Sequence, residues 1–528
     1  MHSVPSRPFA ARALLASLTL CASVFAACGG EKPAPTPDPP TVTLTVPQPN
    51  TAAPSLTVRV IVSGCDAVSR VDIYDRDTFL KSVPYTSGSM DFELAPNEIK
   101  YDRGLAVNLS LNARATCADG RTNSSQPQPA TFLPVKKVIK DPDPNGQVVT
   151  DFFTAEGSGD TAAFIGCGNT TTGTGTLYRV DATGVVRNTL EMQIPCSAST
   201  VVTELHPTTN KRWVWTPGVG AIAVDSNFVV TGKTAPSYKL MNLSVMSNGD
   251  ALVSDGPSVS RLQHTASGGT FQWTYQGLWA PVGPAKQRAE QVLIPIVRVP
   301  QESTGLLVEL VVITVDANKT GPGANPNNPA VSERTILQFT GAVEHPPLTA
   351  FNLDGSVIYI SFPFNNNQAR VQACLTSMDG CEGAAYKWAS PFFPVEIQGV
   401  FPYAAGSRLA IVGLQRVWFL DSNTGLVVNK GGTSVDASGQ LQILQVQMGR
   451  ATTSEFYILA GPPPGSSGLP TMPQEIVAVD TAEQGELFRY EVSSSLSCSV
   501  DDSGRLWMRL GNNLVQALTL PEYRAVKK

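Results

Sequence analysis

Residues 406–425, GSRLAIVGLQRVWFLDSNTG, contain the unit that decides the fold of this chain. A Gly-Ser turn leads into the apolar run of residues 409–412, and a second apolar run ends at Leu420-Asp421 before a polar turn with Gly425. Short apolar runs bounded by turn residues are typical of buried β-strands. An Asp in such a turn commonly accepts hydrogen bonds from nearby backbone amides, so we expect Asp421 to stabilise its turn.

Both halves of this unit recur from residue 147 to the C-terminus. The turn that leads into an apolar run recurs at residues 159–165, 249–253, 355–360, 406–412 and 504–508, with weaker copies near Lys211, Gln291 and Ser454. The apolar-Asp turn recurs at Val180-Asp181, Val224-Asp225, Val315-Asp316, Leu420-Asp421 and Val479-Asp480. Eight copies at a period of roughly 48 residues match the four-stranded blades of a β-propeller. The sequence therefore predicts an all-β chain whose residues 147–528 form a propeller, eight-bladed by this count.

This repeat resembles the PQQ-like repeat. Both have the order of a strand, an apolar-x-apolar-Asp turn, a Gly, a further strand and a closing aromatic. Trp273, Trp388 and Tyr490 are the closing aromatics, which we expect to pack between blades. The resemblance raises the quinoprotein dehydrogenases, which carry an adjacent cysteine pair, a Ca²⁺ site and a catalytic Asp. This sequence has no Cys-Cys pair, so no cofactor is expected.

Catalytic motifs are missing from the sequence. His206, His264 and His345 each stand alone, and neither H-E-x-x-H nor G-x-S-x-G occurs, so no catalytic residue is assigned. The leading interpretation is a non-enzymatic binding or scaffolding propeller with a protein or glycan partner. The alternative is a propeller enzyme, either a lyase or a quinoprotein-like protein, with its pocket at the propeller axis. A long polar insertion at residues 317–329 and loops near Cys167, Cys196 and Cys498 on one face are candidate binding features.

Residues 41–135 are expected to form a separate β-sandwich. Apolar residues alternate with polar ones at residues 42–46, 56–62 and 105–113, which predicts strands with one buried face. Residues 68–74 and 113–120 resemble the bacterial Ig-like domains of surface proteins, and a domain of this length suits such a sandwich.

The N-terminus is typical of an exported lipoprotein. A basic start with Arg7 and Arg12 precedes an apolar run at residues 13–24, and Phe25-Ala26-Ala27 stand directly before Cys28. This pattern resembles the lipobox of bacterial lipoproteins, which implies a signal peptide of residues 1–27 and a lipid on Cys28. An ordinary secretory signal is the alternative. Because Gly29 and not Asp follows the cysteine, we expect the outer membrane.

Residues 28–40, which contain five prolines, are expected to form an extended tether, because proline lacks the backbone donor that helices and sheets require. The order of modules then resembles the outer-membrane lipoproteins that help to insert β-barrels, with the sandwich as an addition. The membrane partner is expected through the lipid alone, because no later apolar run approaches 20 residues.

Charge excludes one class of partner. The chain has 43 acidic and 38 basic residues, a formal net charge of −5, and no basic cluster, so no nucleic-acid partner is expected. Residues 136–146 are expected to be a linker. Within them Asp141, Asp143 and Asn145 fit the start of a Ca²⁺ loop, but Phe152 stands where an EF-hand needs Glu, so calcium is the lesser hypothesis.

Nine cysteines suit an exported protein in which disulfides persist. Cys21 leaves with the signal and Cys28 takes the lipid. The spacing of the remaining seven suggests three local pairs, with Cys498 as a spare thiol: Cys65 with Cys117, Cys167 with Cys196, and Cys374 with Cys381.

Overall fold

The structure is a computed structural model of the chain. It describes residues 37–99, 106–141, 148–154, 162–167, 174–181, 185–195, 200–203, 206, 208–234, 240–265, 268–276, 280–300, 307–317, 332–340, 347–364, 368–394, 397–403, 406–429, 434–448, 455–463, 474–480, 485–492, 498–500, 506–510, 512–518 and 522. Cys28, the expected signal peptide and most of the expected tether lie outside these residues.

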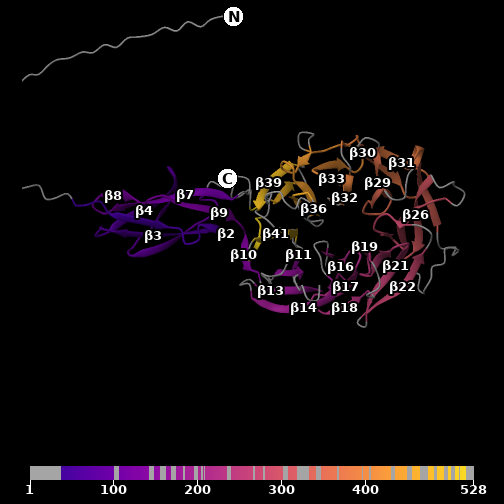
Figure 1. Ribbon diagram of the computed structural model, residues 1–528, viewed down its shortest axis with the longest axis horizontal. Coiled ribbons are helices and arrows are strands. Elements are labelled where there is room, and N and C mark those ends of the chain that lie inside the picture. The colour runs from indigo at the N-terminus through magenta and orange to yellow at the C-terminus, as the bar shows by residue number, and fades with distance from the viewer. Residues whose placement is uncertain are drawn as a thin grey trace, which may run out of the picture.

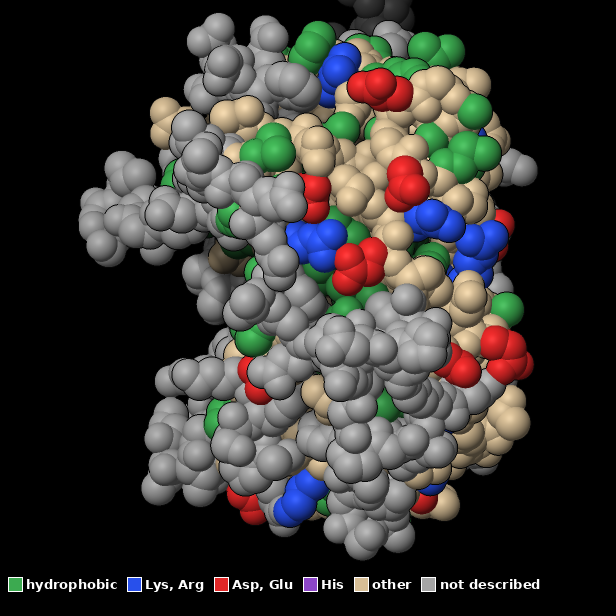
Figure 2. Space-filling view, turned by 90° about the vertical axis from the view of Figure 1, so that its right-hand side faces the viewer, with side chains coloured by type: hydrophobic (Ala, Val, Ile, Leu, Met, Phe, Trp, Pro, Cys, Tyr) green, Lys and Arg blue, Asp and Glu red, His purple; other side chains and the backbone are tan. Residues whose placement is uncertain are grey.

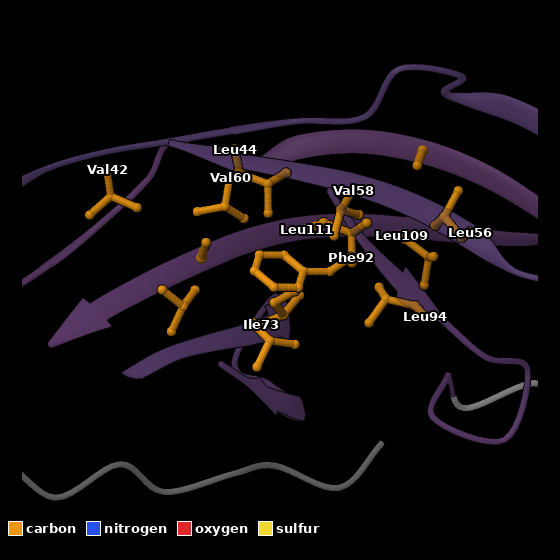
Figure 3. Close-up of a cluster of buried hydrophobic side chains, with 14 of the residues drawn as sticks. Val42, Leu44, Leu56, Val58, Val60, Ile73, Phe92, Leu94, Leu109 and Leu111 are labelled. Atoms are coloured by element: carbon orange, nitrogen blue, oxygen red, sulfur yellow. The ribbon is translucent and has the colours of Figure 1, made fainter. Parts of the chain in front are cut away.

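The N-terminal domain is a sandwich of two β-sheets. The first sheet has the order β1-β3-β6, with bounds β1 (Thr41–Thr45), β3 (Leu56–Ser63) and β6 (Ser89–Leu94). The second has the order β2-β9-β7-β4-β5 with β8 beside β7, and its bounds are β2 (Asn50–Ala53), β4 (Val68–Asp75), β5 (Thr78–Val83), β7 (Val107–Cys117), β8 (Thr122–Ser124) and β9 (Gln128–Pro134). The alternating residues of both sheets meet in one apolar core, which Figure 3 shows around Val58, Ile73, Phe92 and Leu111.

The rest of the described chain forms eight further sheets, which Figure 1 shows radiating around a common axis. We number them as blades 1 to 8, each given from its innermost strand outward. Blade 1 is β11 (Val148–Thr154), β12 (Ala162–Cys167), β13 (Thr174–Val180) and β14 (Val186–Pro195); blade 2 is β15 (Val201–Val202), β16 (Lys211–Thr216), β17 (Gly220–Asp225) and β18 (Val230–Lys233); blade 3 is β19 (Asn242–Val245), β20 (Ala251–Asp255), β21 (Ser258–Thr265) and β22 (Gly268–Gln276). Blade 4 is β23 (Ala280–Pro281) and β24 (Lys286–Arg288), both paired with β25 (Gln291–Arg298), then β26 (Leu307–Asp316) and β27 (Ser332–Thr340).

The remaining blades follow the same plan. Blade 5 is β28 (Leu348–Phe351), β29 (Val357–Phe364), β30 (Gln368–Leu375) and β31 (Tyr386–Ala389), with the short 3-10 helix η1 (Gly383–Ala385) before β31; blade 6 is β32 (Ile397–Tyr403), β33 (Arg408–Gly413), β34 (Arg416–Asp421) and β35 (Val435–Asp436). Blade 7 is β36 (Gln442–Met448), β37 (Glu455–Gly461), β38 (Gln474–Asp480) and β39 (Gly485–Val492), and blade 8 is β40 (Cys498–Val500), β41 (Leu506–Leu510), β42 (Asn513–Gln516) and β10 (Lys137–Lys140). The predicted eight-bladed β-propeller is thereby confirmed.

The two sequence repeats correspond to fixed positions in the blades. Each turn that leads into an apolar run precedes the second strand of a blade, as Gly406 precedes β33. Each apolar-Asp turn ends the third strand, as Asp421 ends β34. These two strands lie in the middle of their sheet and are covered by neighbouring blades on both faces. The edge-to-face contact between Phe419 of blade 6 and Phe456 of blade 7, with centroids 5.2 Å apart, is one such packing contact.

Residues 137–140, which were expected to belong to a linker, form a strand of the propeller. β10 pairs antiparallel with β42, with Lys137 opposite Gln516 and Lys140 opposite Asn513. The N-terminal end of the propeller thus supplies the outermost strand of the blade whose other strands come from the C-terminal end. This pairing closes the ring, and the propeller begins at residue 137 and not at residue 147.

The outer side of the propeller near β26 and β27 is polar. Figure 2 shows acidic and basic side chains next to one another there, between stretches of uncharged surface. In this region Arg298 contacts Glu309 at 3.2 Å and Glu333 at 2.7 Å, and Arg334 contacts Asp379 at 3.3 Å.

Candidate interaction surface

Strand direction sorts the loops of every blade onto two faces. Neighbouring strands within each blade are antiparallel, so the turn between the first and second strands lies at the same end as the turn between the third and fourth. We call this end the hairpin face. The described Gly and Asp turns lie on it, as do the end of β26 and the start of β27, between which the 317–329 insertion falls.

Three of the five Asp side chains, those of Asp181, Asp225 and Asp421, accept hydrogen bonds within their turns, as expected. Asp181 Oδ1 accepts a hydrogen bond from Val185 N at 3.0 Å, and Asp225 Oδ1 accepts one from Val229 N at 2.8 Å. Asp421 Oδ1 accepts from Asn423 N at 3.0 Å and from Thr424 N at 3.1 Å. Burial alone would raise the pKa of Asp421, but these hydrogen bonds together with Arg408 hold it below its ordinary value.

Two closing aromatics join one blade to the next. Trp273 Nε1 of blade 3 donates to Ala317 O of blade 4 at 3.4 Å, and Trp388 Nε1 of blade 5 donates to Ser422 O of blade 6 at 2.9 Å. The predicted packing of these aromatics between blades is confirmed for Trp273 and Trp388. The side chain of Tyr490 lies outside the described residues.

A disulfide braces the hairpin face of blade 5. Cys374 and Cys381 are bonded, with their Cα atoms 5.4 Å apart, across the loop that follows β30. Thr376 N donates to Ser356 O at 3.0 Å and Thr376 Oγ1 donates to Gly355 O at 2.7 Å, which ties this loop to the turn before β29. Gly380 N also donates to Thr335 O of blade 4 at 2.7 Å. The loop is therefore held on three sides.

Blade 6 continues this framework. Ser422 N donates to Ser407 O at 3.2 Å, so the turn after β34 is bonded to the turn before β33. Leu353 of blade 5 reaches that second turn, since a Cβ on Gly406 would lie 3.1 Å from Leu353 Cγ. Together with the hydrogen bond from Trp388 to Ser422, these contacts connect the turns of blades 5 and 6 to one another. We call this set of connected turns the circuit.

Four large apolar side chains project from this circuit into solvent. They are Leu353 at 57% exposed, Met378 at 43%, Tyr386 at 40% and Leu426 at 61%. We call these four residues the blade 5–6 surface. Apolar and aromatic side chains on a rigid frame, surrounded by polar turn residues, are typical of the centre of a protein–protein interface. Exposure of this kind cannot be read from a sequence, because a turn leucine has the same neighbours in sequence whether or not it is covered.

The described residues include neither a metal-binding cluster nor a histidine side chain without a neighbouring polar atom. Within the ranges given above, no group of three or more His, Cys, Asp or Glu residues is placed to hold a metal ion. His206 Nε2 lies 3.0 Å from Ser247 O, and its Nδ1 lies 3.3 Å from Thr209 N. The side chains of His264 and His345 lie outside the described residues.

Asp141, the first residue of the calcium hypothesis, is paired with another part of the protein. The residue is 1% exposed as a whole, and its Oδ2 forms an ion pair with Arg509 Nε of β41 at 2.8 Å, while its backbone N donates to Asn512 O at 2.9 Å. Asp141 therefore extends the closure of the ring beyond β10, because a buried carboxylate needs a compensating charge. Asp143 and Asn145 lie outside the described residues.

Two of the three suggested disulfides are present. Cys65 bonds Cys117 with a Cα–Cα distance of 5.7 Å, and Cys374 bonds Cys381 as described. The side chains of Cys167, Cys196 and Cys498 lie outside the described residues. The end of β12 and the start of β40 place the backbones of Cys167 and Cys498 on the face opposite the hairpin face. Among the described residues, no helix has the length and hydropathy needed to cross a bilayer.

No protein-family model and no curated protein matches the sequence. The chain is similar to the solved structure of the C-terminal WD40 domain of Sif2, with 10% identity, a TM-score of 0.47 and coverage of 73% of this chain and 99% of that one. It is also similar to the computationally designed Ika8 protein, with 10% identity, a TM-score of 0.45 and coverage of 73% of this chain and 99% of that one. BamB from Moraxella catarrhalis is similar at 10% identity and TM-score 0.37, with coverage of 73% of this chain and 97% of that one.

Proposed function

We propose that this protein is a lipoprotein of the cell envelope whose propeller binds a protein partner through the blade 5–6 surface without catalysing a reaction. The observation that carries the proposal is the exposure of Leu353, Met378, Tyr386 and Leu426 on turns that are held by a disulfide and by inter-blade hydrogen bonds. Because the frame is already ordered, a partner that covers these side chains gains apolar burial at little cost in ordering entropy.

A protein partner suits this surface better than a glycan. Three of the four side chains are aliphatic or thioether groups, which gain free energy when they are covered by other apolar groups. Tyr386 is the one aromatic ring among the four, and its amphipathic character is typical of interface residues.

The cellular place of this module is proposed from the N-terminus. Cys28 after Phe25-Ala26-Ala27 would carry the lipid, and Gly29 favours the outer membrane. The N-terminal sandwich is proposed to be Ig-like on the resemblance of residues 68–74 and 113–120, and its two packed sheets agree with that class.

Site-specific photo-cross-linking in the native cell envelope tests the binding surface. A photoreactive phenylalanine analogue at Tyr386 or Met378 should join the protein to one partner of defined mass. The same analogue at Met241, which is 55% exposed and lies at the opposite face, is the matched control and should not. Leu426→Asp should reduce cross-linking from Tyr386 at least about tenfold, because a charge within an apolar contact is strongly unfavourable. Equal cross-linking from both faces, or an unchanged yield in Leu426→Asp, would overturn the proposal.

A further inference from the structure

The chain passes from the sandwich into the propeller at two adjacent residues, Val135 and Lys136, whose backbone amides are both hydrogen-bonded. Val135 N donates to Ala53 O of β2 at 3.2 Å, which continues the sandwich sheet. The next residue, Lys136, donates from its backbone N to Gln516 O at 2.8 Å, which already belongs to blade 8. Adjacent residues thus hydrogen-bond to different domains, and a hinge would have to break one of these bonds.

Apolar packing reinforces this passage. Val135 is 1% exposed and belongs to a cluster that includes Leu506, Val515 and Leu518 of the propeller. The sandwich residues Ala52, Val107 and Leu133 pack against the same cluster. On the surface, Lys136 Nζ lies 2.6 Å from a carboxylate oxygen of Glu522. A shared core of this kind resists relative domain motion in a way that a flexible linker does not.

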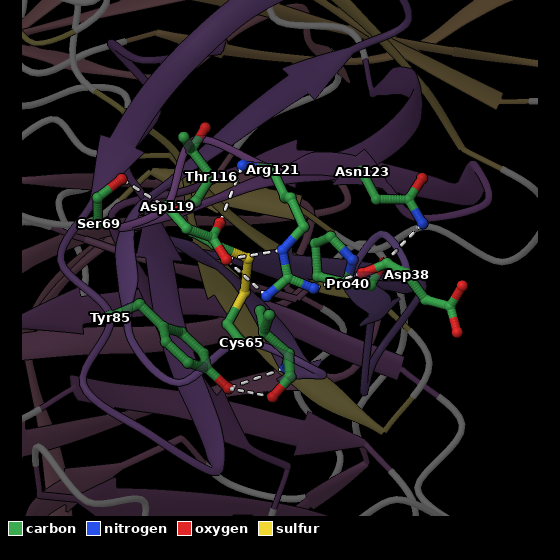
Figure 4. Close-up of a disulfide and its surroundings, with 11 residues drawn as sticks. Asp38, Pro40, Cys65, Ser69, Tyr85, Thr116, Asp119, Arg121 and Asn123 are labelled. Carbon is green, nitrogen blue, oxygen red and sulfur yellow. Dashed lines mark hydrogen bonds and ion pairs between the residues drawn. A yellow bond between two sulfur atoms is a disulfide. The ribbon is translucent and has the colours of Figure 1, made fainter. Parts of the chain in front are cut away.

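The opposite end of the sandwich holds the chain that enters from the N-terminus. Figure 4 shows the Cys65 disulfide with Arg121 and Asn123 beside it. Arg121 donates to Asp38 O, and Asn123 Nδ2 donates to Pro40 O at 2.6 Å. Arg121 is itself fixed by Asp119, whose Oδ2 lies 2.7 Å from Arg121 Nε. The entering segment is therefore attached at one pole and the propeller at the other.

We infer that the sandwich is a rigid arm that holds the propeller by its rim. In Figure 1 the sandwich extends outward from the ring beside β10 and does not overlie it. Both faces of the propeller, including the hairpin face, are therefore left open by the arm. A partner can approach either face while the entering chain is held at the far pole. The inference concerns the junction and holds whether or not the blade 5–6 surface binds a partner.

Hydrogen exchange on the unmodified protein tests the junction directly. The amides of Val135 and Lys136 should exchange on the order of 100-fold more slowly than in an unstructured peptide, because both are hydrogen-bonded across packed elements. Rapid exchange at these two amides, with β9 and β42 still protected, would show a hinge and overturn the inference.

Two matched variants distinguish an effect on the junction from a general loss of packing in the sandwich. Leu133→Ser removes a side chain that packs against the propeller cluster, and Leu80→Ser removes one that packs only against the sandwich core. Leu133→Ser should raise exchange at Val135 and Lys136 at least about tenfold, while Leu80→Ser should not. Small-angle scattering should show one fixed maximum dimension for the wild type, and a broader distribution when a Gly-Ser-Gly-Ser segment is inserted between Val135 and Lys136. Identical scattering for these two proteins would also overturn the inference.

Discussion

The indole ring of Trp388 fills the space that a Cβ atom on Gly425 would occupy. An ideal Cβ at Gly425 would lie 2.3 Å from Trp388 Cε3, and the φ angle of Gly425 is +70°. The two residues come from different blades, and the ring also donates from Nε1 to Ser422 O. The Gly of the Asp turn is therefore needed twice, for its backbone conformation and for the approach of the neighbouring blade.

Gly425→Ala should destabilise the propeller by about 2–3 kcal/mol, since the methyl group forces Trp388 out of its place in addition to straining the turn. Gly439→Ala is the matched control, because Gly439 has φ +56° and no atom within 4 Å of its Cβ position. The control should cost only about 1 kcal/mol of backbone strain. Denaturant unfolding followed by tryptophan fluorescence measures both. Equal destabilisation by the two substitutions would show that the contact with Trp388 contributes nothing.

This contact also shows why the sequence predicted the middle of each blade well. The second and third strands are continuous apolar runs ended by Gly or Asp turns, so eight copies were visible in the sequence. The first strands are short or irregular, such as β15 with two residues and β23 with two, and show no periodic pattern. Their position is set by the neighbouring strand and not by their own residues.

The strand β10, which closes the ring, could not be recognised in the sequence for a different reason. Residues 137–140 read KVIK, which is too short to stand out beside the Pro-Asp run that follows, and their partner β42 lies at the other end of the chain. Asp141 is a calcium candidate in the sequence because Asp143 and Asn145 follow it at the spacing of a Ca²⁺ loop. Its ion-pair partner in the structure, Arg509, becomes a neighbour only when the ring closes.

Asp141→Asn should cost about 3–5 kcal/mol, because it leaves Arg509 without its charge partner in a site where the two side chains are 0% and 10% exposed. Asp379→Asn is the control, since the Asp379–Arg334 pair has side chains 63% and 44% exposed and should contribute less than about 1 kcal/mol. Thermal unfolding measures both, and added Ca²⁺ should leave the wild-type melting temperature unchanged. A rise with Ca²⁺ that Asp141→Asn abolishes would support the calcium hypothesis instead.

Tyr403 offers a substitution that should increase stability. Its ring packs against Phe419 and Phe456, and its hydroxyl is buried with no hydrogen-bond partner among the described residues. Tyr403→Phe should therefore be neutral or stabilising by about 1 kcal/mol. Tyr85→Phe is the control and should cost about 1 kcal/mol, because the Tyr85 hydroxyl accepts a hydrogen bond from Val62 N at 2.9 Å. A loss of stability in Tyr403→Phe as large as in Tyr85→Phe would contradict this prediction.

The same residue gives the stability a defined dependence on alkaline pH. Burial raises the pKa of the Tyr403 hydroxyl well above its ordinary value of about 10, and the nearby Arg408 offsets only part of that rise. Above a pH of about 10 the unfolded chain loses the Tyr403 proton while the folded state keeps it. The free energy of unfolding is therefore unaffected by Tyr403 ionisation below a pH of about 10 and falls as the pH rises further. Denaturant midpoints measured between neutral and strongly alkaline pH should fall less steeply in Tyr403→Phe than in the wild type. Parallel curves for the two proteins would exclude Tyr403 as a source of the dependence.

Cys28 decides whether the arm is attached to a membrane. If it carries the lipid, the mature protein should incorporate labelled palmitate, and its processing should be blocked by globomycin, an inhibitor of lipoprotein signal peptidase. Cys28→Ala should abolish both, whereas Cys21→Ala, which changes a cysteine inside the expected signal peptide, should leave both intact. Because residues 37–40 are held at the pole of the sandwich far from the propeller, loss of the lipid should release the protein from membranes without changing its fold. Palmitate incorporation that persists in Cys28→Ala would refute the lipoprotein assignment, and the arm would then have to serve some attachment other than a lipid.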